Sequence, residues 1–151
     1  MHVRTNCRSA FTLVELVVVV LILGILAAIA APRVLGTSAR ATDNSVRHSL
    51  SVIRSAIQCY AAEHGGTLPG ADGVEATFQN DISAYIRGGV LPKCPVDGSR
   101  QNEIYILADG ESPGSNATVG THAWAYNHKT GEFHVNCPDL SSDQVTTYDQ
   151  F

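Results

Sequence analysis

Hydrophobic residues follow two different patterns along the chain. The first is an unbroken run from Leu16 to Ala31, in which all 16 residues are apolar or glycine. With residues 11–15 added, the segment is about 31 Å long as a helix, which is enough to cross a bilayer once. Residues 1–10, which precede this segment, contain Arg4 and Arg8 but no acid. The positive-inside rule therefore keeps this end in the cytoplasm and the rest of the chain on the other side.

The second pattern is amphipathic. Apolar residues recur with spacings of four, three, four and three, at Val46, Leu50, Ile53, Ile57 and Tyr60. This period predicts a helix with one stripe facing a core. The two glycines at positions 65 and 66 predict its end.

The two patterns join into one predicted helix from about Thr12 to His64. We expect a kink between Pro32 and Gly36, because proline removes a backbone donor and clashes with the preceding turn. The first half is apolar on all sides, whereas the second half needs burial on one face only. These requirements suit a subunit whose head folds alone and whose stalk is buried among other copies.

The rest of the chain predicts a small head. Its predicted elements are a turn at 67–70, a short helix at 74–86, an exposed loop at 109–120 and strands at 103–108, 121–126 and 132–137. If Tyr126 pairs with Phe133, one face of the sheet carries Trp124, Tyr126, Phe133, Val135 and Cys137. The expected fold class is α+β, with the long N-terminal helix packed on a small three-stranded antiparallel sheet.

Glu15 is a carboxylate near the start of the apolar segment. An acid at the centre of a bilayer costs about 2.5–3.5 kcal/mol and is usually retained for a partner. A secretory signal peptide, cut after the small residues at 28–30, would explain the basic start and the apolar run. A plain single-pass anchor would explain them equally well. Neither interpretation explains Glu15.

A cut between Ala10 and Phe11 supplies a partner for this carboxylate. The new α-amine of Phe11, with a pKa of about 7.7–8, would be cationic and one helical turn from Glu15. The two charges could pair within one chain, or between chains that pack side by side with an axial stagger. Because loss of one partner of a buried pair costs about 3–5 kcal/mol, such a pair would select one register between copies.

The sequence Ser-Ala-Phe-Thr-Leu-Val-Glu before an apolar helix resembles the N-terminus of type IV pilins and of type II secretion pseudopilins, the substrates of prepilin peptidase. The resemblance implies cleavage between Ala10 and Phe11, N-methylation of Phe11 and a role for Glu15 in assembly. The segment from Pro32 to Gly36 also resembles the end of the hydrophobic segment in these families. One position departs from the family pattern, since the residue before the cut is usually glycine and is Ala10 here.

The likeness to a major pseudopilin further implies a leader at 1–10, an assembly helix at 11–31, an amphipathic half-helix at 32–66 and a head at 67–151. It implies a structural subunit of a type II secretion pseudopilus. Its partners would be copies of itself, minor pseudopilins or pilins, prepilin peptidase, the inner-membrane assembly platform and, before assembly, membrane lipid. The protein would cross the bacterial inner membrane once, with its head in the periplasm, and later form a periplasmic or cell-surface fibre.

Two alternatives to the secretion pseudopilus stay open. One is a type IV pilus pilin that serves adhesion, motility or DNA uptake. The other is a soluble periplasmic binding module, released from the membrane by signal peptidase.

Charge and motif content exclude other classes of function. The net charge is −4 and the chain has only 10 lysines and arginines, so no basic surface for nucleic acid is expected. The sequence contains no nucleophile elbow, phosphate-binding loop, CxxC pair or HExxH motif. We therefore predict that the chain is not an enzyme and has no cofactor.

Cysteines offer one candidate disulfide. Cys7 lies in the leader, which leaves Cys59, Cys94 and Cys137 in a compartment where disulfides are permitted. Cys94 and Cys137 each precede a proline at the edge of a predicted element, and Cys137 projects toward the core, whereas Cys59 lies off its helix stripe. We predict a Cys94–Cys137 bridge, worth about 4 kcal/mol for a loop of about 44 residues. The alternative is that all three thiols are reduced.

Metal ligands are not assigned. Histidines recur every six residues, at His122, His128 and His134, but the predicted hairpin places them apart. Acids that could donate oxygens to Ca²⁺ are Asp139, Asp143 and Asp149 in the tail and Asp109 and Glu111 in the loop. The resemblance implies that calcium could bind near the C-terminus, but the acidic loop pattern of major pseudopilins is not clear in this chain.

Overall fold

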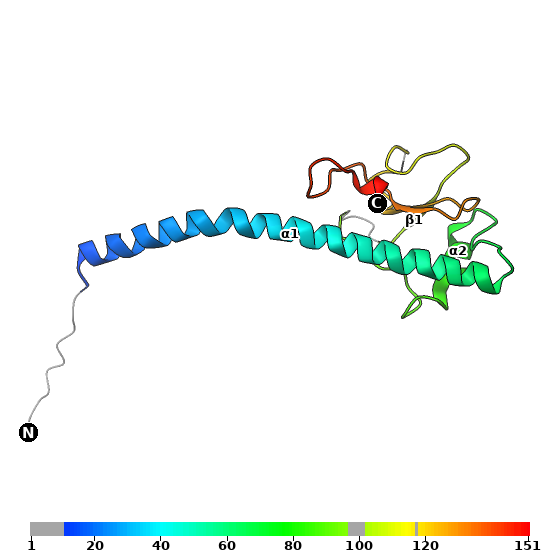
Figure 1. The fold of residues 1–151 in the computed structure, drawn as a ribbon, viewed down its shortest axis with the longest axis horizontal. Helices are drawn as coiled ribbons and strands as arrows, with labels where there is room; N and C mark the ends of the chain where they lie inside the picture. Colours follow the sequence, from blue (N-terminus) through cyan, green and yellow to red (C-terminus); the bar gives the residue numbers. More distant parts are fainter. Residues whose placement is uncertain (1–10, 97–101, 117) are drawn as a thin grey trace, which may run out of the picture. The chain divides into compact units, whose positions relative to one another are not determined.

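The computed structural model describes residues 11–96, 102–116 and 118–151, without the side chains of residues 31–36. Its elements in chain order are α1 (Leu13–Glu63), α2 (Glu75–Ser83), β1 (Ile104–Ile106), β2 (Trp124–Tyr126), β3 (Phe133–Val135) and a 3₁₀ helix, η1 (Tyr148–Gln150) (Figure 1). The chain divides into two compact units, one ending at Ser38 and the other covering Ala39–Phe151. The α+β class is confirmed.

The long predicted helix is present as α1. The helix is continuous through residues 32–36, and a bend there stays a prediction. In the head unit, the predicted stripe is confirmed because Val46, Leu50, Ile53 and Ile57 are buried. The helix ends as the glycines predicted: Gly65 and Gly66 have positive φ angles, and the Gly66 amide donates to the carbonyl of Ala61 at 2.8 Å.

The sheet has the order β1-β2-β3. Strands β2 and β3 are antiparallel and Tyr126 pairs with Phe133, so the predicted register is confirmed. The prediction of a fully antiparallel sheet was wrong, because β1 runs parallel to β2 and Ile104 pairs with Trp124. Parallel neighbours need a crossover instead of a hairpin, and the described residues between β1 and β2, 107–116 and 118–123, form a long loop.

The core lies between α1, α2 and the sheet. The predicted sheet face is buried together with the stripe of α1 and with Phe78 and Ile82 of α2. Phe78 lies against Tyr126, with 4.2 Å between ring centroids. The polar atoms of two buried aromatic side chains have hydrogen-bond partners. The Tyr126 hydroxyl donates to the carbonyl of Pro69, and the indole N–H of Trp124 donates to the carbonyl of Pro92. Strand β2 is buried on both faces.

Candidate functional site

The first turn of α1 contains the residues with predicted assembly roles. Thr12 caps the helix: its hydroxyl oxygen accepts a hydrogen bond from the Glu15 amide at 3.2 Å. Glu15 lies in the first turn, where the helix dipole favours a negative charge. Phe11 is 70% exposed immediately before the cap. Ala10, on the other side of the predicted cut, lies outside the described residues.

Among the residues that the structure describes, the N-terminal half of α1 has no partner within its own chain. By length and composition, Leu13–Ala30 could cross a membrane, and none of it is buried inside the protein. Its large apolar side chains are between 46% and 79% exposed. This surface needs cover from lipid or from other protein chains.

A second feature fastens the end of the chain to α1. We call residues 139–151 the C-terminal strap. Asp43 of α1 is buried and accepts hydrogen bonds from the amide and hydroxyl of Ser142 and, at 2.7 Å, from the hydroxyl of Tyr148. One turn further along α1, the Arg47 guanidinium lies 3.6 Å from the centre of the Phe151 ring. The strap therefore completes the head against the helix.

The charge on Asp43 is stabilised by these contacts. Burial by itself would raise the pKa of the Asp43 carboxyl, but the hydrogen bonds from Ser142 and Tyr148 outweigh it and lower that pKa below its ordinary value. Burial, together with the hydrogen bond to the Asp43 carboxylate, raises the pKa of the Tyr148 hydroxyl. Sequence reasoning missed this site, because a charged residue was not counted in the stripe, although Asp43 lies three residues before Val46 at its edge, and nothing in the polar tail marks its partners.

The tip of the strap is a turn held by Asp143. One carboxylate oxygen accepts bonds from the Val145 and Thr146 amides, both at 2.9 Å, and from the Ser141 hydroxyl at 2.8 Å. The other accepts the Thr146 hydroxyl at 2.7 Å. These bonds hold the pKa of Asp143 well below its usual range. The rigid turn leaves the side chain of Val145 80% exposed.

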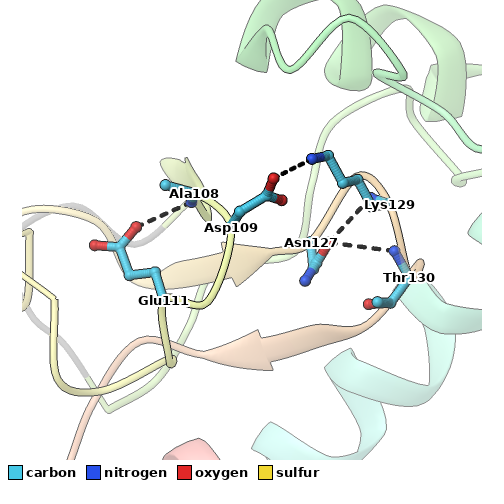
Figure 2. Close-up of polar contacts among 6 residues, drawn as sticks. All are labelled: Ala108, Asp109, Glu111, Asn127, Lys129 and Thr130. Carbon is cyan, nitrogen blue, oxygen red and sulfur yellow. Dashed lines mark hydrogen bonds and ion pairs between the residues drawn. The ribbon is translucent and has the colours of Figure 1, made fainter.

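The loop after β1 is fixed by local polar contacts (Figure 2). Asp109 forms an ion pair with Lys129 from the β2–β3 turn. Glu111 accepts the amide of Ala108 at 3.0 Å. Asn127 closes the hairpin turn by accepting the amides of Lys129 and Thr130. Both acids of this loop are thus bonded within the head.

Asn136 fixes the next part of the same loop. Its side chain is fully buried, and its oxygen accepts bonds from the Gly114 amide at 3.1 Å and the Asn116 amide group at 2.7 Å. Its nitrogen donates to the Thr118 hydroxyl, the His122 carbonyl and the Asn116 side-chain oxygen. A neutral amide therefore organises residues 114–116 and 118–122. Sequence reasoning missed this role, because Asn136 reads as an ordinary strand-end residue.

The N-terminal segment matches a known family, and most of the chain matches known proteins. Residues 5–31 match the family described as the prokaryotic N-terminal methylation motif. Across the chain, it is 32% identical to the type II secretion system core protein G of Pseudomonas aeruginosa, over 78% of this chain and 95% of that protein. The chain belongs to the type II secretion system core protein G family.

Other members of the family match less closely. The core protein G of Vibrio cholerae is 28% identical over 74% of this chain and 76% of its own length. That of Klebsiella michiganensis is 23% identical over 83% of this chain and 99% of its own length. No solved structure gives a significant match to the chain. Membership in this pseudopilin family makes the chain a structural protein rather than an enzyme.

In this core protein G family member, no disulfide joins the three described cysteines. Cys59 is exposed, whereas Cys94 and Cys137 are buried in the same core cluster. Burial raises the pKa of Cys137 to about 11, and the neighbouring Cys94 contributes to that shift. The predicted Cys94–Cys137 bridge is therefore not formed in this structure, although both thiols lie in one core. The pairing stays a prediction for the oxidised protein.

The histidines and acids considered as metal ligands have separate surroundings. His134 bonds the carbonyl of Asp149, and His122 bonds the hydroxyl of Thr121. His128 lies against Gly73 in another part of the head. Within residues 11–96, 102–116 and 118–151, no three histidine, cysteine, aspartate or glutamate side chains are grouped as a metal site would require.

Proposed function

We propose that the chain is made as a single-span precursor, cut between Ala10 and Phe11, methylated on the new amine of Phe11 and assembled into the helical fibre of a type II secretion pseudopilus. Prepilin peptidase would make the cut. The fibre would grow from the inner-membrane assembly platform, with copies of this chain and minor pseudopilins as its subunits. The head would lie in the periplasm.

The observation that carries this proposal is the position of the matched motif on α1. The methylation motif covers residues 5–31, so it spans the proposed cut as well as Glu15. The cut would leave two residues, Phe11 and Thr12, before the first residue of α1. The apolar part of α1 that follows is exposed on all sides, as a helix that packs among copies requires.

The capped first turn supports a register role for Glu15. Its own amide is bonded to Thr12, so the turn is already ordered before assembly. The carboxylate of one copy would then meet the Phe11 amine of another within an apolar bundle. Because such a pair is costly to break, it would stabilise one axial stagger over others.

Intact-mass measurement of the exported protein tests the proposal. We expect a mature chain that begins at Phe11 and carries one added methyl group. A chain that begins near Ala31 would instead mean signal-peptidase release and would contradict fibre assembly. The matched control is an Ala10→Gly variant, which restores the residue usual at this position and should give the same mature mass.

A further inference from the structure

A groove on the head leads to one of the two buried cysteines. It has a volume of about 180 Å³, roughly six times the share of one water molecule in the liquid. The residues that line it are Val96, Val119, Gly120, Cys137, Pro138 and Asp139. Gly120, Pro138 and Asp139 are exposed, whereas Cys137 is the least exposed of the lining residues, at 8%. The groove therefore has room for the sulfur atoms of a small disulfide beside the Cys137 thiol.

Cys94 lies on the inner side of Cys137. Its side chain is 0% exposed, and it does not line the groove. It belongs to the same core cluster as Cys137 and is near enough to contribute to the raised pKa of that thiol. A reagent that arrives from solvent therefore meets Cys137 first, while Cys94 adjoins the same sulfur from the core.

Asp139 gives the groove its charge. Its amide donates a hydrogen bond to the Cys137 sulfur, and the Cys137 thiol donates one to the Asp139 carboxylate. Of the described residues that line the groove, it alone is charged. The backbone here is held by the strap, since the Asp139 carbonyl accepts the Tyr148 amide at 3.0 Å. An anion fixed beside the sulfur attracts a cationic reagent and repels an anionic one.

We propose that this groove is a site of thiol–disulfide exchange, in which Cys137 is the entry thiol, Cys94 is the resolving thiol and the oxidant is a disulfide flanked by positive charge. The inference goes beyond the predicted bridge, because it assigns the order of attack and the chemical class of the oxidant. It does not depend on assembly of the fibre.

The exchange takes place in two steps. The Cys137 thiol loses its proton to water and its sulfur attacks one sulfur of the oxidant, whose S–S bond breaks and releases one half as a thiolate that takes up a proton. Cys94 then loses its proton and attacks the Cys137 sulfur of the mixed disulfide, which releases the second half as a thiol. The two cysteines lose two electrons, and the oxidant is reduced to two thiols.

The surroundings of Cys137 make this exchange selective. Burial raises its pKa to about 11, so the thiolate is scarce near neutral pH. The thiolate that does form is a strong nucleophile, because nucleophilicity rises with the pKa of the thiol. Exchange is therefore slow with a disulfide free in solution and faster with one that the Asp139 carboxylate holds in the groove.

Trapping of the mixed disulfide tests the order of attack. The full chain in detergent, in a Cys59→Ser background, is treated with cystamine, a small disulfide with two positive charges, and its adducts are mapped by mass spectrometry. With Cys94→Ala, Cys137 should keep one cysteamine group. With Cys137→Ala, Cys94 should react about tenfold more slowly, because solvent does not reach it. The chain that keeps both cysteines should form the internal bridge and carry no adduct.

The class of oxidant is tested by comparing two disulfides at low salt. Cystamine is cationic at neutral pH, whereas glutathione disulfide is anionic. In the Cys94→Ala chain, Asp139→Asn should lower the ratio of the two rate constants about fivefold. A changed pKa of Cys137 alters both rates alike and cancels from this ratio. Glu132→Gln removes an exposed acid that does not line the groove, and it should leave the ratio unchanged.

Folding of each variant is checked by the fluorescence of Trp124, and serine replaces alanine at either cysteine if the alanine variant is unfolded. Labelling of Cys94 as fast as Cys137 would overturn the order of attack. So would a folded Cys94→Ala chain that reacts only after denaturation. An adduct that stays on Cys137 when both cysteines are present would remove the resolving role of Cys94. An unchanged ratio in Asp139→Asn would remove the assigned class of oxidant.

Discussion

The hydroxyl of Tyr148 donates a 2.7 Å hydrogen bond to a carboxylate oxygen of Asp43, across 105 residues of sequence. The other oxygen of Asp43 accepts the amide and hydroxyl of Ser142. One buried carboxylate therefore joins the long helix to the strap. Because buried groups that lose their partners are costly, this site controls both the stability of the head and its response to acid.

Removal of the Asp43 carboxylate should loosen the strap. We expect Asp43→Ala to lower the free energy of unfolding by about 1–3 kcal/mol, because the Tyr148 hydroxyl and the Ser142 amide lose their acceptor. Urea unfolding of the full chain in detergent, followed by the fluorescence of the single tryptophan, Trp124, measures this change. Tyr148→Phe removes one of the bonds and should cost less. If Asp43→Ala and the wild type have the same free energy of unfolding, this carboxylate does not stabilise the head.

The pH dependence of stability should report the same site. The folded pKa of Asp43 is lowered from its ordinary 3.8, so the contribution of its charge is fully present above about pH 4 and is lost as the pH falls through the lower folded value. The stability difference between wild type and Asp43→Asn should shrink as the pH is lowered below 4. Melting curves at pH 7, 5, 4 and 3 would measure it, and a constant difference would contradict the assignment.

Asn136 should be the most sensitive polar residue of the loop. Asn136→Ala leaves the Gly114 amide and the carbonyl of His122 without their partner, at a cost of about 2–4 kcal/mol. Asn136→Asp should also be harmful, since an anion cannot donate to those acceptors. Asn80→Ala, at an exposed position on α2, is the matched control. If Asn136→Ala unfolds at the same urea concentration as this control, the network does not stabilise the head.

Glu15 should affect assembly but not membrane insertion. Glu15→Gln keeps the size of the side chain and removes its charge, so the variant should remain in the membrane fraction and form few fibres. Fractionation and electron microscopy of sheared fibres would measure the two properties. The control is Glu63→Gln, which removes an acid at the other end of α1. Fibres in normal number from Glu15→Gln would remove the role assigned to the carboxylate.

The cysteine pair should oxidise after export. Cys94 and Cys137 would lose two protons and two electrons to a disulfide-bearing oxidant of the periplasm, so alkylation of the denatured mature chain should modify only Cys59. After reduction, three thiols should react. With Cys94→Ser, two thiols should react without reduction. Three adducts on the unreduced wild-type protein would show that the pair stays reduced.

Local patterns predicted the parts of the fold that depend on nearby residues. The spacing from Val46 to Ile57 identified the buried face of α1, and strand parity placed Trp124 and Phe133 on the same buried face of the sheet. Both predictions work because side-chain direction follows directly from the helical or strand period. Glu15 could also be located, since one charge within an apolar run is conspicuous.

Features that depend on distant parts of the chain could not be predicted. The direction of β1 depends on the path of a long loop, and no period records that path. The partners of Asp43 lie 99 and 105 residues away in a polar tail that carries no periodic signal. Arg54 reads as a solvent-facing residue in the helix pattern, and only the structure places its guanidinium on the edge of β3.

The bond between Asp43 and Tyr148 also has a consequence for the order of folding during synthesis. A ribosome releases the helix that carries Asp43 long before it adds Ser142 and Tyr148. Until then the Asp43 carboxylate has no Ser142 or Tyr148 to bond, and the core of the head lacks the side chain of Tyr148. The head therefore closes late, after nearly all of the chain has been made, and an interrupted chain would expose this unfinished core to proteases.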